Sequence, residues 1–370
     1  MKHNIKLVIL IILINISYGL PRFTVENGTS CVACHVNPTG GGMRNAYGND
    51  IVSLEELPME KWINKGSTNW DGAIGEHLEI GGDFRIQGIQ YDSVTTRKTA
   101  IFPMQADIYT SLIINQNATI FNKIGVRGRN NFATEYWLLI NNLPQNVWFK
   151  IGKGLPNFGL RVDDHTSFIR GGNYKRTTLG LEEEGLLFDP FLDPPTIIEI
   201  GLPILGGLYW TSSLSTSINN IIDEHLNNLT TQINYTTSFN NQLKYMIAFS
   251  YMEEGLLELW GLSGGLSFSN LTYTFEIDQA KNLILGSTSI ANYNQIAWEV
   301  IQGIQIIGKH DFFDPQYELL SGSISRYSIG VELYPLNILE IKLQARINKN
   351  DKLGVENPNP EYLIQTHFWF

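Results

Sequence analysis

The only two cysteines of this 370-residue chain lie within five residues, Cys31-Val32-Ala33-Cys34-His35. Two thiols separated by two residues can each add to one vinyl group of a porphyrin, and the histidine that follows is placed to ligate the iron. The spacing therefore predicts one covalently bound haem c, with Cys31 and Cys34 as attachment points and His35 as the proximal axial ligand.

Three other kinds of site use part of this pattern. A redox-active C-x-x-C pair needs no following histidine and usually lies near a βαβ pattern, which this sequence lacks. A zinc site requires four ligands, and no second Cys/His pair follows at finger-like spacing. A disulfide would close a very short loop, which stabilises little. Haem c is the interpretation that uses all three side chains.

The second axial ligand of the iron is less sharply indicated, because either methionine or histidine can fill that position in an electron carrier. Met43 is the nearest candidate, and the turn at 38–42, with one proline and three glycines, lets the chain fold back toward the haem. A methionine is more often a packing residue, however. Met59, His77 and a lumen histidine such as His165 are the alternatives.

Residues 1–19 have the composition of an export signal. Lys2 and Lys6 precede an apolar run at 7–16, and Ser17 and Gly19 supply small residues at the positions that signal peptidase reads, so we expect cleavage after Gly19. The apolar run is short for a membrane-spanning helix of about 20 residues, and no later stretch approaches about 18 apolar residues. Export agrees with the motif, because haem c is attached outside the cytoplasm.

The net charge of −10 argues against nucleic acid as a partner. Residues 20–75 are too few to build a large core, and they contain the cysteine motif. We therefore expect a signal peptide at 1–19, a monohaem cytochrome c segment at 20–75 and a β domain at 76–370.

From residue 76 onward the dominant period is two, as in strands with one apolar and one polar face. At 271–278, for example, leucine, tyrosine, phenylalanine and isoleucine alternate with threonine, glutamate and aspartate. The pattern predicts sixteen strands, with fourteen or eighteen left open, at 78–91, 102–115, 117–129, 133–141, 146–153, 177–188, 195–201, 206–218, 227–239, 242–252, 257–268, 269–280, 294–310, 322–334, 337–349 and 360–370.

A soluble β-sandwich would also alternate, but three features favour a transmembrane β-barrel. The predicted strands are longer than the ~5–6 residues typical of soluble sheets. The last nine residues alternate and end on an aromatic, with Tyr362, Ile364, Phe368 and Phe370 expected to face outward into outer-membrane lipid. Aromatics that could form interfacial girdles lie at strand ends, namely Tyr136, Trp137, Trp148, Trp210, Trp260 and Trp298. Sixteen strands leave room for an aqueous lumen.

The longest strand-free segment of the β domain, at 154–172, combines carboxylates, an imidazole and arginines. In barrels of this size such a loop can fold into the lumen as a constriction. Asp163, Asp164 and His165 are also suitable ligands for a transition metal. The alternative is a solvated loop in which these groups pair with its own arginines, Arg161 and Arg170.

Together these features resemble the fused monohaem cytochrome–porin proteins of bacterial outer membranes, of the type associated with iron oxidation. The architecture matches over the whole chain. In sequence the likeness is specific at Cys31, Cys34 and His35 and weaker at Pro38 and 45–48, while the glycine-rich stretch 39–43 departs from it. The resemblance implies single-electron transfer across the outer membrane between an extracellular donor or acceptor and periplasmic carriers. Iron(II) oxidation is implied by the resemblance alone.

Two other functions remain open. The chain could be a diffusion porin in which the haem segment is a redox-responsive or structural plug, because the polar strand face fits both functions. It could also be a periplasmic cytochrome fused to a soluble β-sandwich.

Overall fold

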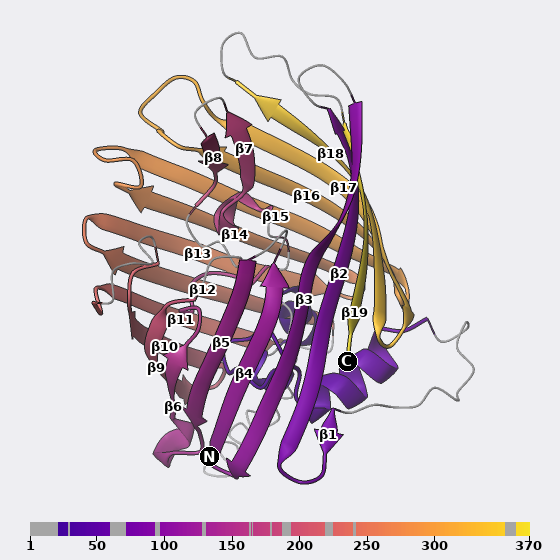
Figure 1. Cartoon of the computed structure of the whole chain (residues 1–370), viewed down its shortest axis with the longest axis vertical. Coiled ribbons are helices and arrows are strands. Elements are labelled where there is room, and N and C mark those ends of the chain that lie inside the picture. The colour runs from indigo at the N-terminus through magenta and orange to yellow at the C-terminus, as the bar shows by residue number, and fades with distance from the viewer. Residues whose placement is uncertain are drawn as a thin grey trace, which may run out of the picture.

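The computed structural model describes residues 21–28, 30–59, 72–92, 97–127, 131–162, 164, 166–177, 180–186, 194–218, 225–239, 242–351 and 360–370. Figure 1 shows strands wrapped around a short helical segment and loops. No helix within these ranges is long and apolar enough to cross a membrane. The expected signal peptide at 1–19 lies outside the described residues.

Sixteen antiparallel strands close into a barrel, in which each strand pairs with the next along the chain and β19 pairs with β2. They are β2 (Leu78–Asp92), β3 (Arg97–Asn115), β4 (Ala118–Arg127), β5 (Asn131–Ile140), β6 (Trp148–Lys153), β9 (Thr196–Leu205), β10 (Leu208–Ser215), β11 (Asn228–Ser238), β12 (Leu243–Glu254), β13 (Leu257–Phe268), β14 (Leu271–Lys281), β15 (Thr288–Ile301), β16 (Ile304–Asp314), β17 (Ile324–Leu336), β18 (Leu339–Asn350) and β19 (Glu361–Trp369).

The remaining elements lie before β2 or in connections between barrel strands. A two-residue strand, β1 (Ala73–Ile74), pairs with the start of β2, and β7 (Asn173–Thr177) and β8 (Gly180–Glu184) form a separate hairpin. The helical elements are α2 (Pro21–Asn27), η1 (Cys31–Ala33), η2 (Gly48–Glu56), η4 (Pro144–Asn146) and η5 (Phe168–Arg170).

The barrel is apolar outside and polar inside. Along β14, Leu271, Tyr273 and Ile277 are exposed on the outer face, whereas Glu276 and Asp278 are completely buried on the inner face. This is the reverse of a water-soluble domain, which buries its large apolar side chains and exposes its carboxylates. The exterior suits hydrocarbon, and the closed sheet rules out the soluble β-sandwich considered above.

The predicted number of strands is confirmed, but two of the predicted segments are wrong and their errors cancel. Of the predicted strand at 177–188, Thr177 and residues 180–184 belong to the β7–β8 hairpin, which is separate from the barrel sheet. The segment 294–310 is two strands, β15 and β16, which turn at Gln302–Gly303. Gly303 has φ +79°, a conformation that glycine adopts without strain. The apolar residues on both sides of this turn made the hairpin resemble one long strand.

The girdle prediction is correct only in part. Tyr136, Trp260 and Trp298 are exposed on the outer face, but Trp137 and Trp148 point into the lumen and are only 2% and 4% exposed. Both belong to an internal aromatic cluster described below. At the C-terminus the predicted outward residues are all exposed, as expected, namely Tyr362, Ile364, Phe368 and Phe370.

The two mouths of the barrel differ. The turns at 116–117, 206–207, 269–270, 302–303 and 337–338 all lie at one end, together with the start of β2 and the C-terminus. We call this end the short-turn mouth. Most of the longer connections lie at the other end, the long-loop mouth. In Figure 1 the indigo helical segment lies at the short-turn mouth, beside the C-terminus.

Candidate cofactor site inside the barrel

Residues 21–59, which we call the plug, lie inside the short-turn mouth. Helix α2 packs against the inner face of β12–β14, and Val25 is completely buried there. Gly265 makes this possible, because a Cβ at that position would lie 2.5 Å from a Val25 methyl group. Arg22 anchors the helix to β17 through an ion pair with Glu332 at 2.6 Å and a hydrogen bond donated to the Tyr334 hydroxyl at 2.7 Å.

The two cysteines lie on the single turn of η1 and the residue after it, and both are thiols rather than a disulfide. Cys34 is 3% exposed, and burial raises the pKa of the Cys31 thiol against the opposing effect of Arg161. The glycine-rich turn folds back onto them. Gly40 has φ +85°, and a Cβ there would lie 3.0 Å from the Cys31 sulfur. The turn can therefore approach the thiol closely only because this position is glycine.

The histidine and methionine of the predicted haem site lie on opposite faces of the returning chain. His35 forms an isolated antiparallel bridge with Arg44, and the Val36 amide donates to the Met43 carbonyl at 3.1 Å. His35 faces a lumen cavity, whereas Met43, 4% exposed, packs into a cluster of wall residues formed by Tyr109, Phe121, Trp137, Leu139 and Trp148. Iron ligation by Met43 stays a prediction, and it would require the side chain to leave this cluster.

A buried lysine of the wall positions the turn after the motif. Lys150, with no exposed surface, lies 2.6 Å from Glu199 and donates a hydrogen bond to the Asn37 side chain at 3.1 Å. Asn37 in turn donates to the Gly40 carbonyl at 2.9 Å. The sequence analysis did not identify Lys150 as a site residue. Its place two residues after Trp148 in the alternating pattern of β6, which puts both side chains on the inner face, could have indicated it.

The cavity that His35 faces measures about 170 Å³ and lies between the plug and the wall. Cys34 and His35 line it from the plug side. Apolar side chains contribute to its lining, among them Phe23, Val52, Leu57, Leu160 and Trp369, and so do the basic side chains Arg22, Arg44, Arg85, Lys309 and Lys342. Three carboxylates, Asp83, Glu332 and Glu340, also line the cavity and pair with Arg85, Arg22 and Lys342. The lining therefore combines apolar surface with charges that are largely paired.

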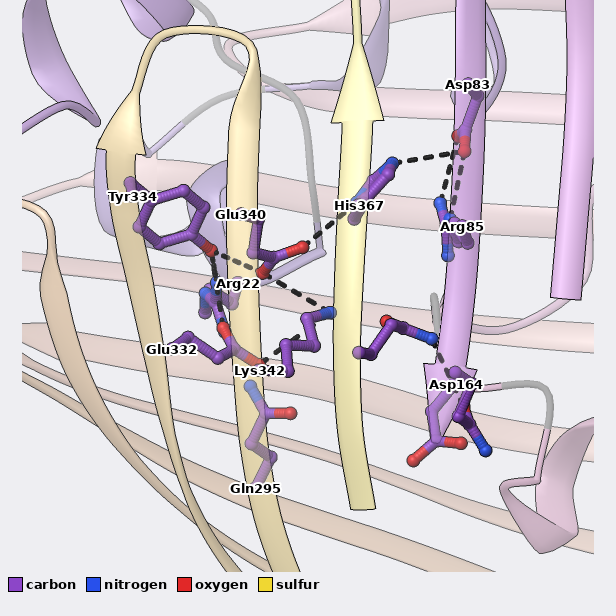
Figure 2. Close-up of polar contacts among 12 residues, drawn as sticks. Arg22, Asp83, Arg85, Asp164, Gln295, Glu332, Tyr334, Glu340, Lys342 and His367 are labelled. Carbon is purple, nitrogen blue, oxygen red and sulfur yellow. Dashed lines mark hydrogen bonds and ion pairs between the residues drawn. The ribbon is translucent and has the colours of Figure 1, made fainter. Parts of the chain in front are cut away.

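The wall side of the cavity holds an ion-pair network (Figure 2), centred on His367 of β19. Its Nδ1 lies 3.0 Å from Glu340 Oε2 on β18, and its Nε2 lies 3.1 Å from Asp83 Oδ1 on β2. Arg85 binds Asp83 with two hydrogen bonds of 3.0 Å, and Lys342 lies 3.4 Å from Glu340. The network ties the first and last barrel strands together.

A larger vestibule of about 1030 Å³ opens at the short-turn mouth. Its lining includes Val32, His35 and Pro38 of the plug and wall residues near the turns at 141–147 and 202–209. His35 therefore lies between the vestibule and the inner cavity.

The loop after β6 folds into the lumen, as predicted. Phe158, Phe168 and Ile169 are buried against inward side chains of the wall. Arg170 forms an ion pair with Glu276 at 2.8 Å, and Ser167 donates to Asp311 at 2.9 Å.

The loop also meets the plug inside the lumen. Arg161 donates to the Thr39 hydroxyl at 3.1 Å, while Leu160 packs with Val25 and Met246. Segments from the two ends of the barrel thus fill part of the lumen with protein.

Of the three residues proposed to bind a metal in this loop, the structure describes only Asp164, and Asp163 and His165 lie outside the described residues. Asp164 accepts hydrogen bonds from the Thr166 amide and hydroxyl and lies 3.4 Å from Lys309. Burial opposes ionisation, but Lys309 and Thr166 hold the pKa of Asp164 well below its usual range. No group of three histidine, cysteine or acidic side chains that could hold a metal occurs among the described residues. Metal binding in this loop stays a prediction.

The donor set around the motif fits a covalent haem. The two thiols have the required spacing, Cys34 and His35 line a cavity with apolar side chains, and Cys31 lines a smaller cavity of about 50 Å³. Cys31, Cys34 and His35 are the residues that would hold it.

No protein-family model and no curated protein matches the sequence. Solved structures with a similar fold include the anion-selective porin from Comamonas acidovorans, 9% identical, with a TM-score of 0.55 over 79% of this chain and 99% of the porin. OprB of Pseudomonas putida is 9% identical, with a TM-score of 0.59 over 80% and 94% of the two chains. OmpF of Salmonella typhi, in complex with daunomycin, is 11% identical, with a TM-score of 0.56 over 79% and 97%. At these identities the likeness shows the fold alone: the chain folds as a porin-like β-barrel.

Proposed function

We propose that this chain is an outer-membrane barrel that carries one haem c in its lumen and passes single electrons between periplasmic carriers and a donor or acceptor outside the cell. One observation carries the proposal: the Cys31-Val32-Ala33-Cys34-His35 segment, whose spacing is typical of haem c attachment, lies inside a porin-like barrel, and Cys34 and His35 line a cavity there. A haem attached at this motif would supply one-electron chemistry at a fixed position inside the barrel.

The apolar exterior supports a location in the outer membrane. In outer-membrane barrels the short turns face the periplasm and the longer loops face outward. By this rule the vestibule beside His35 faces the periplasm, where soluble carriers can approach. The plug then brings the attachment motif within the membrane-spanning barrel, whose apolar band is ~25 Å tall, and shortens the distance to the outer side.

The chain's own residues close the barrel around the motif. Arg22 of the plug and Arg170 of the lumen loop are largely buried and each pairs with a glutamate of the wall, while the wall residue Lys150 donates to Asn37 of the plug. These contacts hold the plug and the lumen loop in place. Water and solutes are excluded from the space that these segments fill. Such a barrel can carry charge without leaking solutes.

The experiment is co-expression with haem c maturation machinery, followed by extraction in detergent and reconstitution into liposomes that contain a trapped electron acceptor. We expect covalent haem in a pyridine haemochrome assay, reduction of the acceptor by an external reductant, and retention of a trapped sugar. The matched control is the Cys31→Ala, Cys34→Ala double variant, which keeps the barrel but lacks the thiols. Wild-type protein without covalent haem under these conditions would falsify the proposal.

A diffusion porin with a haem-bearing plug is the second candidate, and the fold favours it, because the solved structures of similar fold are named porins and channels. In this case sugar or anion flux through the reconstituted barrel should be substantial and should not depend on an electron acceptor. Iron(II) as the donor rests on the resemblance of the motif alone. It is tested in the same liposomes by replacing the reductant with ferrous iron.

A further inference from the structure

The cavity beside the attachment motif contains a second histidine that the sequence did not single out. His367 of β19 is 8% exposed and lines the same cavity as His35, one from the wall and the other from the plug. Resting on the proposed function, we propose that His367 is the second axial ligand of the haem iron, so that two imidazoles hold it.

The first argument is position. Among the histidine and methionine side chains of the described residues, those that line the cavity are His35 and His367. Met43 is packed in the aromatic cluster on the opposite face of the chain. Others lie elsewhere: for example, Met59 contacts Gly303 at the short-turn mouth, the His77 imidazole donates to the Ile113 carbonyl at 2.9 Å, and His310 packs against Tyr327.

The second argument is the state of the two ring nitrogens. Nδ1 lies 3.0 Å from Glu340 Oε2, in hydrogen-bond geometry. Metal-bound histidines commonly donate their second N–H to a carboxylate, which fixes the tautomer and makes the other nitrogen a better donor to the metal. Nε2 is fully buried and lies 3.1 Å from Asp83 Oδ1 without the alignment of a hydrogen bond. It is therefore the nitrogen that would exchange its contact with Asp83 for the iron.

The third argument is what holds the ring. Trp369 packs against it with the ring centroids 4.7 Å apart, and the Arg44 guanidinium lies over the Trp369 ring at 4.9 Å. Arg44 is also the residue that bridges to His35 through the backbone. His367 thus contacts Trp369, Trp369 contacts Arg44, and Arg44 is bridged to His35 through the backbone.

Asp83 is not left without a partner if His367 turns Nε2 to the iron. Arg85 binds both of its oxygens at 3.0 Å, so the aspartate keeps a bidentate ion pair. The rearrangement therefore removes one contact of the network and preserves the rest.

The test uses the full-length protein matured with haem, and the pyridine assay comes first, because absence of covalent haem overturns the proposed function and this inference with it. With haem present, optical and electron paramagnetic resonance spectra of the oxidised wild type should be low-spin, with the signature of two imidazoles and no methionine-to-iron charge-transfer band. A wild-type spectrum of one imidazole and one thioether, or of five-coordinate high-spin iron, overturns the inference while leaving haem attachment intact.

Variants separate the candidate ligands. His367→Gly should lose the low-spin signal and regain it when imidazole is added, because imidazole can occupy the space that the side chain leaves. Met43→Leu, which nearly conserves volume in the aromatic cluster, should keep the wild-type spectrum, and His310→Gly on the outer face controls for loss of a histidine. The opposite result, loss in Met43→Leu and an unchanged spectrum in His367→Gly, overturns the inference. If His367→Gly does not fold, the wild-type spectrum alone decides.

Discussion

Arg170 should act as the anchor that keeps the lumen loop inside the barrel. Its guanidinium donates to both carboxylate oxygens of Glu276, at 2.8 and 3.0 Å, and lies 3.7 Å from Asp278. It also donates to the Phe158 and Leu160 carbonyls of its own loop. One cation therefore joins the loop to two carboxylates of β14, neither of which has any exposed surface.

Replacing Arg170 by methionine keeps most of the volume and leaves two carboxylates buried without their cation. Removing one partner of a buried ion pair typically costs about 3–5 kcal/mol. Each 1.4 kcal/mol changes a population ratio about tenfold, so the ratio of docked to undocked loop should fall by roughly 100- to 3000-fold. The barrel itself should persist, because its strands are held by backbone ladders that the substitution does not touch.

The assay is single-channel conductance in planar bilayers, with limited proteolysis of the loop at 154–172 as a second readout. Arg170→Met should show larger or more frequent openings than wild type and faster cleavage. Lys281→Met is the matched control, because its pair with Glu258 is 3.4 Å long and half-exposed, and such surface pairs contribute about 0–1 kcal/mol. If Arg170→Met conducts and resists protease no differently from Lys281→Met, the loop is held by something other than this ion pair.

Three further predictions follow from the plug. Substituting either Cys31 or Cys34 by alanine should leave one thioether and a shifted haemochrome band, and substituting both should remove haem that survives denaturation. Burial raises the pKa of Glu26 to about 7, so the folded plug retains a proton that the unfolded chain releases from about pH 4.5 upward. Docking should therefore weaken as pH rises between those values, and protease sensitivity of the plug should increase from about pH 5 to about pH 8 in wild type but not in Glu26→Gln. Lys150→Met should leave Glu199 buried and uncompensated at a cost of about 3–5 kcal/mol, measured as a lower yield of covalent haem and a plug more sensitive to protease.

The barrel was predictable because its constraint is local and repeated. Apolar and polar residues must alternate along each strand, because one face contacts lipid and the other faces the polar lumen. This pattern is visible within about ten residues, as at 271–278. Alternation does not say which neighbour a strand pairs with. Strand β8 (Gly180–Glu184), which falls within a segment that alternates in part, is not in the wall, whereas the turn at Gln302–Gly303 carries only a weak break in the pattern.

Sequence alone indicates only the covalent part of the proposed cofactor site. Cys31, Cys34 and His35 are adjacent in sequence, so their chemistry is local. The partner proposed for His35 across the cavity is 332 positions away and is brought there by the closure of β19 onto β2. If the second axial ligand is chosen by its distance from His35 along the chain, Met43 is selected. Distance along the chain does not show, however, that Met43 and His35 lie on opposite faces of the returning chain.

The closed seam between β2 and β19 bears on when the two cysteines can be modified, before or after the barrel closes. In the finished barrel Cys34 is 3% exposed, and the plug that carries both thiols is enclosed by a wall whose first and last strands meet along a ladder from Asp83–Trp369 to Gln90–Tyr362. A ligase large enough to place haem on two thiols cannot reach them through that wall. If haem c is bound as proposed, it would have to be attached while the exported chain is still open, before β19 pairs with β2 and encloses the plug. Barrels refolded in vitro without haem should consequently resist later modification at the buried Cys34 more than at the partly buried Cys31.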